Sequence, residues 1–328
     1  MKSMTLSEKN MLYTMIIFAA LLIVVVCAVT LYIYLNVFHN KKRPVVTDPY
    51  AGLASEFLEG MRDVIRIQID DLSAYPCEEI RVPSYDGLSL HARFYAADEK
   101  KPVAILMHGY KGSSYTELSG AALMMLSHGL SVIVADERSH GQSEGGTITF
   151  GIKERHDCVS WVEYVKARFG EKRAVVLYGI SMGAASVLMA SELLSRDSIK
   201  AIVADCPYSS PEGIIKRVMK NRGLPPRAVY PAVVLSALVW GRFRLGASRP
   251  DKAVKNTDIP ILLIHGENDN FVPPSMSEDI KRAAASECIL ASVEGAAHGQ
   301  CFAVWGEEYV KTVLSFIDSH TIIKGDIL

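Results

Sequence analysis

The stretch that decides the fold runs from Ala174 to Gly183 and reads AVVLYGISMG. Its first five residues are a short apolar run of the kind that forms a strand buried on both faces. GISMG follows, and a stretch with helical spacing begins directly after it. Glycine on either side of Ser181, at positions 179 and 183, allows the backbone to crowd into a sharp strand-to-helix turn. We therefore expect Ser181 to project from this turn as a nucleophile rather than to lie in an ordinary loop.

Similar Val- and Ile-rich runs recur along the chain and alternate with amphipathic stretches. The predicted strands are 79–83, 88–95, 103–107, 131–135, 174–178, 199–204, 261–264 and 289–293. The predicted helices are 115–128, 152–169, 182–195, 275–286 and 302–317. Regular alternation of strand and helix predicts an α/β fold with a mostly parallel central sheet flanked by helices on both faces.

One interval, about 207–258, is too long for a single crossover helix and contains six prolines. We expect it to be a helical cap inserted over the strand ends. Its arginines could bind anionic substrate groups, but solvation is the favoured interpretation. Its apolar helix, 229–240, could line a substrate pocket or touch a membrane.

A serine hydroxyl needs a nearby imidazole to accept its proton, and a carboxylate to orient that imidazole. His298 lies in a Gly-rich loop after the last predicted strand, where a mobile base could reach Ser181. His140 is the second candidate. His108 and His265 each follow a strand and precede glycine, which suits a structural role in a turn.

Asp269 is the preferred acid because it follows the strand 261–264, in a loop beyond the carboxyl edge of the sheet. Asp205 is a plausible rival and Glu267 a weaker one. The order Ser181, Asp269, His298 is the order expected for this architecture. For the oxyanion hole we expect the backbone N–H groups of Met182 and Tyr110.

An uncharged apolar segment precedes this body. No residue between Lys9 and Lys41 is formally charged, and Thr30 is the one polar interruption from Met15 to Leu35. These 21 residues would span about 30 Å as a helix, the thickness of a bilayer core. The run is longer than the apolar region of a cleaved signal peptide. We therefore expect a retained single-pass anchor in the cell membrane, through about residues 11–38.

The expected organisation is an anchor over 1–43, a connector over 44–76 and a catalytic body over 77–328. Leu53, Met61 and Ile65 fall at helical spacing and predict an amphipathic helix in the connector. Residues 1–43 carry a net charge of +4 and the remainder −5. Two lysines precede the anchor and three basic residues follow it. The positive-inside rule would therefore place the body in the cytoplasm, but a difference of one charge leaves the side of the membrane undetermined.

Composition excludes several function classes. The chain has 328 residues, 22% of them charged, and a formal net charge of −1. A broad basic surface for nucleic acid is therefore not expected. The five cysteines outside the anchor cannot all pair within one chain, and no Cys/His spacing typical of a metal site occurs. A disulfide scaffold and a zinc site are therefore not expected.

Five motifs carry a resemblance to a known family. They are HGYKG (108–112), ADERSHGQSEGG (135–146), GISMG (179–183), HGENDNFVPP (265–274) and GAAHG (295–299). Over about 77–318 the chain resembles the alpha/beta-hydrolase superfamily, specifically bacterial membrane-anchored hydrolases of the serine aminopeptidase and esterase-like group. The resemblance implies that the 135–146 motif, with Asp136, Arg138, His140, Gly141 and Ser143, is a structural loop beside the active site.

The resemblance also implies hydrolysis of an ester, thioester or amide through an acyl-enzyme, without metal or organic cofactor. We expect a serine hydrolase of small-molecule or lipid-like acyl substrates, and a carboxylesterase is the leading interpretation. A serine aminopeptidase or a monoacylglycerol-type lipase is the alternative within the enzyme class. A non-catalytic, membrane-tethered binding module is the alternative outside it.

Overall fold

An eight-stranded sheet forms the centre of the molecule, in a computed structural model that describes residues 5–40, 49–50, 53 and 60–321. The strand order is β1-β2-β4-β3-β5-β6-β7-β8. β1 and β2 pair antiparallel, β2 runs antiparallel to β4, and the remaining neighbours are parallel. The strands are β1 Glu78–Pro83, β2 Ser89–Tyr95, β3 Val103–Met107, β4 Ser131–Ala135, β5 Val175–Ile180, β6 Ile199–Asp205, β7 Ile261–Gly266 and β8 Cys288–Val293.

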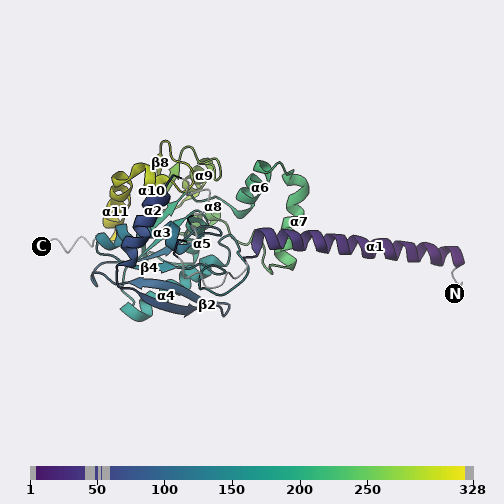
Figure 1. The fold of residues 1–328 in the computed structure, drawn as a ribbon, viewed down its shortest axis with the longest axis horizontal. Coiled ribbons are helices and arrows are strands. Elements are labelled where there is room, and N and C mark those ends of the chain that lie inside the picture. The colour runs from purple at the N-terminus through teal and green to yellow at the C-terminus, as the bar shows by residue number, and fades with distance from the viewer. Residues whose placement is uncertain (1–4, 41–48, 51–52, 54–59, 322–328) are drawn as a thin grey trace.

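Helices cover both faces of this sheet (Figure 1). Successive residues of β3 alternate between two separate cores: Ile105 packs with α4 and α5, whereas Leu106 packs with α3 and α11. This is the period of two that a strand buried on both faces must show. The flanking helices are α3 Ser114–Ser127, α4 Glu154–Phe169, α5 Met182–Ala190, α9 Ser275–Ala283, α10 Cys301–Trp305 and α11 Glu307–Thr321. The predicted α/β class and mostly parallel sheet are confirmed.

Three predicted helices have different bounds in the structure. The helix expected over 302–317 is two helices, α10 and α11, because the chain breaks at Gly306 with φ +55°. The helix expected to end at 195 ends at Ala190 and continues as a short 3₁₀ turn, Ser191–Leu193. Much of the helix expected from Leu53 to Ile65 lies outside the described residues. The described helix there is α2, Arg62–Ser73, which buries its inward face against α3.

A long helix, α1 (Leu6–Ile33), extends away from the body, and a π-helical turn at Tyr34–Phe38 continues it (Figure 1). Thr5 and Glu8 form a capping box at its start. The 33 residues from Leu6 to Phe38 are long and apolar enough to cross a membrane. Where this segment enters the body, its last residue, Phe38, is fully buried between the rings of Phe150 and Phe243.

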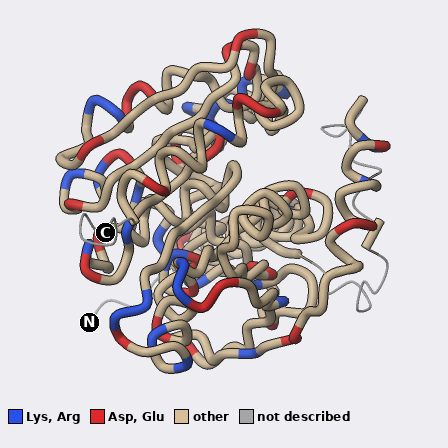
Figure 2. The backbone as a smooth tube through the Cα atoms, turned by 90° about the vertical axis from the view of Figure 1, so that its left-hand side faces the viewer, with Lys and Arg blue, Asp and Glu red and all other residues tan. Residues whose placement is uncertain are grey.

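The interval predicted to be a cap contains α6 (Pro211–Asn221), α7 (Pro226–Val239) and the short α8 (Pro250–Ala253). In Figure 1, α6 and α7 stand beside α1, at the end of the body that the long helix leaves. On the opposite end of the body, basic and acidic residues are interspersed along the chain (Figure 2). The apolar helix predicted at 229–240 thus corresponds to α7, which packs on α1.

Candidate active site

Ser181 occupies the sharp turn between β5 and α5, with φ +54° and ψ −110°. A non-glycine residue is strained in this conformation. The glycines on either side make the turn possible. A Cβ on Gly179 would lie 2.4 Å from the Gly183 carbonyl, and a Cβ on Gly183 would lie 2.1 Å from the carbonyl oxygen of Met107. The packing of strand on helix thus fixes the serine at the carboxyl edge of the sheet.

The structure brings Ser181, His298 and Asp269 together in hydrogen-bonding order. Nε2 of His298 lies 3.0 Å from Oγ of Ser181, and its Nδ1 lies 2.6 Å from Oδ2 of Asp269. The carboxylate can only accept, so Nδ1 carries the proton and Nε2 is left to accept from the serine hydroxyl. This is the arrangement by which an imidazole can take a proton from a nucleophilic serine.

Asp269 is held in its ionised form by its surroundings. Burial opposes the charge, but hydrogen bonds from His265 and His298 outweigh it and lower the pKa of Asp269 to about 2. Its second oxygen accepts the backbone N–H groups of Phe271 and Val272, at 2.9 and 2.8 Å. The carboxylate is therefore fixed on both sides and stays anionic near neutrality.

The rival candidates are engaged in structural bonds. Nε2 of His140 accepts the Lys111 N–H at 3.0 Å, and burial beside His108 lowers the pKa of His140 to about 3. Oδ2 of Asp205 accepts the hydroxyl of Tyr309 at 2.8 Å. The other three candidates are placed as follows: His108 accepts the Glu137 N–H, His265 bonds Ser277 and the Val272 carbonyl, and Glu267 is exposed.

Of the two expected oxyanion donors, Met182 follows the serine directly and Tyr110 lines the same cavity as Ser181. Met182 opens α5, so its N–H is among the first donors of a helix that have no partner within it. In the 109–112 loop, the N–H groups on either side of Tyr110 are occupied: Gly109 donates to Glu117 and Lys111 to His140. Within the described part of the chain, the Tyr110 N–H has no hydrogen-bond acceptor. It is thus available to a bound oxyanion.

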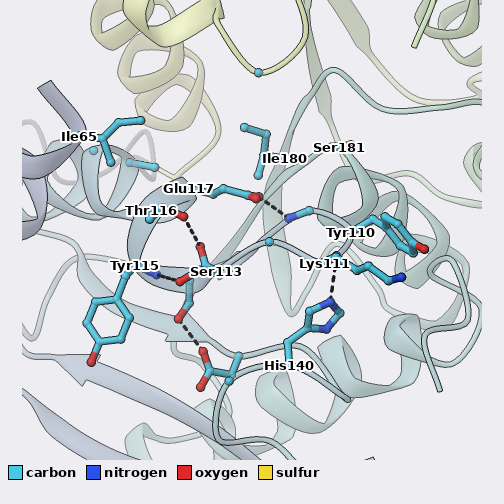
Figure 3. A pocket seen from close by; sticks show the side chains of 18 of the residues that line it. Ile65, Tyr110, Lys111, Ser113, Tyr115, Thr116, Glu117, His140, Ile180 and Ser181 are labelled. Atoms are coloured by element: carbon cyan, nitrogen blue, oxygen red, sulfur yellow. Dashed lines mark hydrogen bonds between the residues drawn. The ribbon is translucent and has the colours of Figure 1, made fainter. Parts of the chain in front are cut away.

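Glu117 is a site residue that the sequence did not reveal. Its carboxylate reaches back from α3 and accepts the Gly109 N–H at 2.6 Å (Figure 3). It also fills the space beside Gly112, where a Cβ would lie 1.9 Å from Oε1. Burial raises the pKa of Glu117. No motif marks it, because the contact depends on how the loop folds back over the first turn of α3.

A cavity of about 430 Å³ opens beside Ser181 and His298. One wall comes from α2, through Met61, Val64, Ile65 and Gln68, and Phe271 and Phe302 also line it. In Figure 3, Ile65 lies on the far side of the cavity from Lys111 and His140. Residues 207–258 do not line this cavity. The helix of the predicted connector therefore borders the cavity, whereas the predicted cap packs beside the site without lining the cavity.

The 135–146 motif forms the structural loop that the resemblance implied. Asp136 accepts hydrogen bonds from His91 at 2.9 Å and from Ser114 at 2.5 Å. Arg138 binds Asp157 and Asp86 through paired hydrogen bonds. These contacts tie the loop to β2, α3 and α4, so that it supports the floor of the cavity.

Known proteins share this architecture. A family model for X-Pro dipeptidyl-peptidase (S15 family) matches residues 86–233. The esterase Pf2001 of Pyrococcus furiosus superposes with a TM-score of 0.61 at 24% identity, covering 77% of this chain and 96% of that one. The fold of this chain is therefore the alpha/beta-hydrolase fold.

Two relatives are similar to this chain in sequence. The protein YqkD of Bacillus subtilis is 26% identical over 239 residues, which cover 73% of this chain and 78% of YqkD. The thiohydrolase AneE of Aspergillus aculeatus is 26% identical over 132 residues, 39% of this chain and 41% of its own length. The chain thus has an alpha/beta-hydrolase fold with a hydrolase-like site.

Proposed function

We propose that this chain is a membrane-anchored serine hydrolase that cleaves esters through an acyl-enzyme, with Ser181 as nucleophile, His298 as base and Asp269 as acid. The observation that carries the proposal is the continuous path from Ser181 Oγ through His298 to Asp269, with distances of 3.0 and 2.6 Å. These three groups meet at a strained turn beside a cavity of about 430 Å³.

The groups have the following roles. Oγ of Ser181 attacks the acyl carbonyl while Nε2 of His298 takes the hydroxyl proton. The developing oxyanion accepts hydrogen bonds from the N–H groups of Tyr110 and Met182. The protonated His298 then gives its proton to the leaving alcohol as the carbonyl–oxygen bond breaks. Water repeats the sequence on the acyl-Ser181 ester and releases the acid.

The carboxyl groups around the cavity favour esters over the aminopeptidase alternative. A peptidase that selects a free amino terminus needs an acceptor for the ammonium group. The carboxyls that line the cavity each accept a hydrogen bond within the protein: Glu117 from the Gly109 N–H, Asp136 from His91 and Ser114, and Asp205 from Tyr309, with Oδ1 of Asp205 buried without a partner among the described residues. An uncharged acyl ester has no ammonium group and needs no such acceptor. Thioesters remain candidates because a relative is a named thiohydrolase.

The anchor is the second part of the proposal. The segment Leu6–Phe38 has a mean hydropathy of 3.0 over its most apolar window, and 6% of that window is buried in the protein. A helix this apolar and this exposed is best solvated by lipid. We place the enzyme at the cell membrane on this basis.

The function is tested by assaying the full-length enzyme in detergent against p-nitrophenyl esters, acyl thioesters, monoacylglycerols and aminoacyl amides. We expect turnover of short or medium acyl esters, and a loss of at least a thousandfold in Ser181→Ala. Ser119→Ala is the matched control, because its hydroxyl bonds only the Tyr115 carbonyl one helical turn away. Turnover of aminoacyl amides alone would replace the esterase assignment with a peptidase. No turnover of any substrate would favour a binding module.

A further inference from the structure

The helix α7 meets α1 at Thr30, near the end of the proposed membrane span. The hydroxyl of Ser236 donates to the Thr30 carbonyl at 2.8 Å, and Nε1 of Trp240 donates to the Thr30 hydroxyl at 3.1 Å. Thr30 is 3% exposed, although it lies in an otherwise exposed helix. The contact is therefore built from complementary polar groups.

The direction of α7 is set by this contact. Figure 1 shows α7 running across α1 rather than along it. A helix that crosses a membrane-spanning helix lies close to the plane of the membrane. The orientation is that of an interfacial helix rather than a second span, and the 14 residues of α7 are too few to cross a bilayer.

The depth of the crossing point agrees with this orientation. Counted from Lys9, the last charged residue before the apolar run, the 20 uncharged residues from Asn10 to Val29 rise by about 30 Å, which is enough to cross the hydrocarbon core. Thr30 then lies at its boundary on the side of the catalytic body. The helix α7 is thus held at the level where acyl chains meet headgroups.

The surface of α7 suits that level. Val233, Ser236 and Ala237 are buried. Four large apolar residues are exposed instead by 38 to 52%, and together they form the outer face of α7: Val234, Leu235, Leu238 and Val239. No charged residue lies between Arg227 and Arg242. Exposed arginines lie near both ends of the helix: Arg222 before it, Arg227 in its first turn, and Arg242 and Arg244 after it.

We propose that α7 inserts its outer face into the interfacial layer of the same bilayer that α1 crosses, with the flanking arginines at the phosphate groups of anionic lipids. This inference rests on the anchor proposed above. Because α7 contacts α1, its apolar outer face adjoins the apolar surface of α1. The guanidinium groups of the arginines can bind the lipid phosphates that would surround this face. Two membrane contacts instead of one fix the tilt of the body, so that the cavity keeps one orientation toward the membrane.

The test uses the full-length protein in vesicles of phosphatidylcholine and phosphatidylglycerol, with photo-reactive p-benzoylphenylalanine placed at single sites. Leu238 reports on α7, Phe18 in α1 is the control inside the bilayer, and Ile289 in β8 is an exposed apolar control on the body. After illumination, lipid adducts are measured by intact mass. We expect adducts at Leu238 and Phe18, and at least tenfold fewer at Ile289.

The controls separate this inference from the anchor. Adducts at Phe18 with none at Leu238 would overturn the interfacial role of α7 and leave the anchor standing. No adduct at either site would overturn both. Crosslinking of Leu238 to a second copy of the chain instead of to lipid would also contradict the proposal.

As a second measurement, replacing Arg242 and Arg244 with Gln should lower Leu238 adducts severalfold in vesicles with phosphatidylglycerol, and leave them unchanged in pure phosphatidylcholine.

Discussion

Ser181 keeps a backbone conformation that costs of order 1–3 kcal/mol because its neighbours leave no alternative. Its N–H donates to the Asp205 carbonyl at 2.8 Å, and its own carbonyl accepts the Ala185 N–H at 3.0 Å. Both flanking glycines are packed against backbone. The strain therefore belongs to the turn as a whole and holds the hydroxyl within reach of His298.

Gly183→Ala tests this packing. The added methyl would lie 2.1 Å from the Met107 carbonyl oxygen, so strand and helix must separate and carry Ser181 away from His298. We expect kcat to fall by at least a hundredfold, with a lower melting temperature. Gly246→Ala is the matched control because nothing lies within 4 Å of its new Cβ. Full activity in Gly183→Ala would contradict the role assigned to the tight turn.

Glu137 is buried beside the site with both carboxylate oxygens unpartnered among the described residues. Burial, together with the charges of Glu154 and Asp157, raises its pKa well above the usual value. Because Glu137 holds its proton more tightly in the folded protein than in the unfolded chain, its protonation favours folding. This contribution is fully present below the pKa of the unfolded chain and is lost as pH rises through the pKa of the folded protein. We expect Glu137→Gln to be more stable than the wild type by about 1–3 kcal/mol at pH 8, with the difference shrinking toward pH 5. Thermal unfolding at the two pH values measures it, and an equal change at both would contradict this account.

The meeting of the three proposed triad residues could be predicted from the sequence because each lies in a loop whose place follows from the strand before it. Ser181, Asp269 and His298 come after β5, β7 and β8, and the carboxyl ends of these parallel strands meet at one edge. Glu117 and Glu137 could not be predicted in this way. Their positions depend on side chains that fold back under a loop, and no spacing in the sequence records that.

The boundary between anchor and body that the sequence pattern predicts differs from the boundary that the packing shows. The apolar run reads as membrane helix up to about residue 38, yet Phe38 fills a core formed by α5, α7 and residues 148–152. The junction also contacts the oxyanion loop, since the Tyr110 hydroxyl donates to the Val37 carbonyl at 2.7 Å and Lys111 Nζ to the Asn36 carbonyl at 2.9 Å. Residues 34–40 thus pack as part of the body. Such long-range packing has no local signature.

Phe38→Ala tests the structural role of the junction. Removing a fully buried ring that two other rings contact edge-on should cost about 3–5 kcal/mol of folding free energy. Because the junction supports Tyr110, activity should fall as well. Denaturant unfolding in detergent gives the free energy, and Phe18→Ala, which truncates a ring that is 70% exposed in α1, should leave it unchanged. Equal effects of the two substitutions would show that Phe38 belongs to the anchor alone.

At the scale of the whole molecule, the alternation of strand and helix was enough to predict the sheet and both layers of helices. It could not predict which segment covers the site. One wall of the cavity comes from α2, before β1, while α7, inserted after β6, contacts α1. Both segments are amphipathic, and either could have covered the strand ends. Tertiary packing alone decides between them.

The charge states of the triad predict a simple pH dependence. Asp269 stays ionised through the acidic range because its pKa is lowered to about 2. Loss of activity on acidification therefore reflects protonation of a group other than Asp269, and histidine is the one side chain whose ordinary charge change falls between pH 5 and 8. We expect kcat/KM to fall below about pH 6 with a slope approaching one per pH unit. A flat profile down to about pH 4 would rule out a histidine base.

The central claim is that Ser181 is the nucleophile, and covalent labelling by a fluorophosphonate tests it most directly. The full-length protein is incubated with the probe, digested, and its peptides are mapped by mass spectrometry. The account predicts one adduct, on the peptide that contains Ser181, which persists in Ser119→Ala and disappears in Ser181→Ala. An adduct that survives Ser181→Ala, or wild-type protein that takes up no probe while it hydrolyses esters, would contradict it.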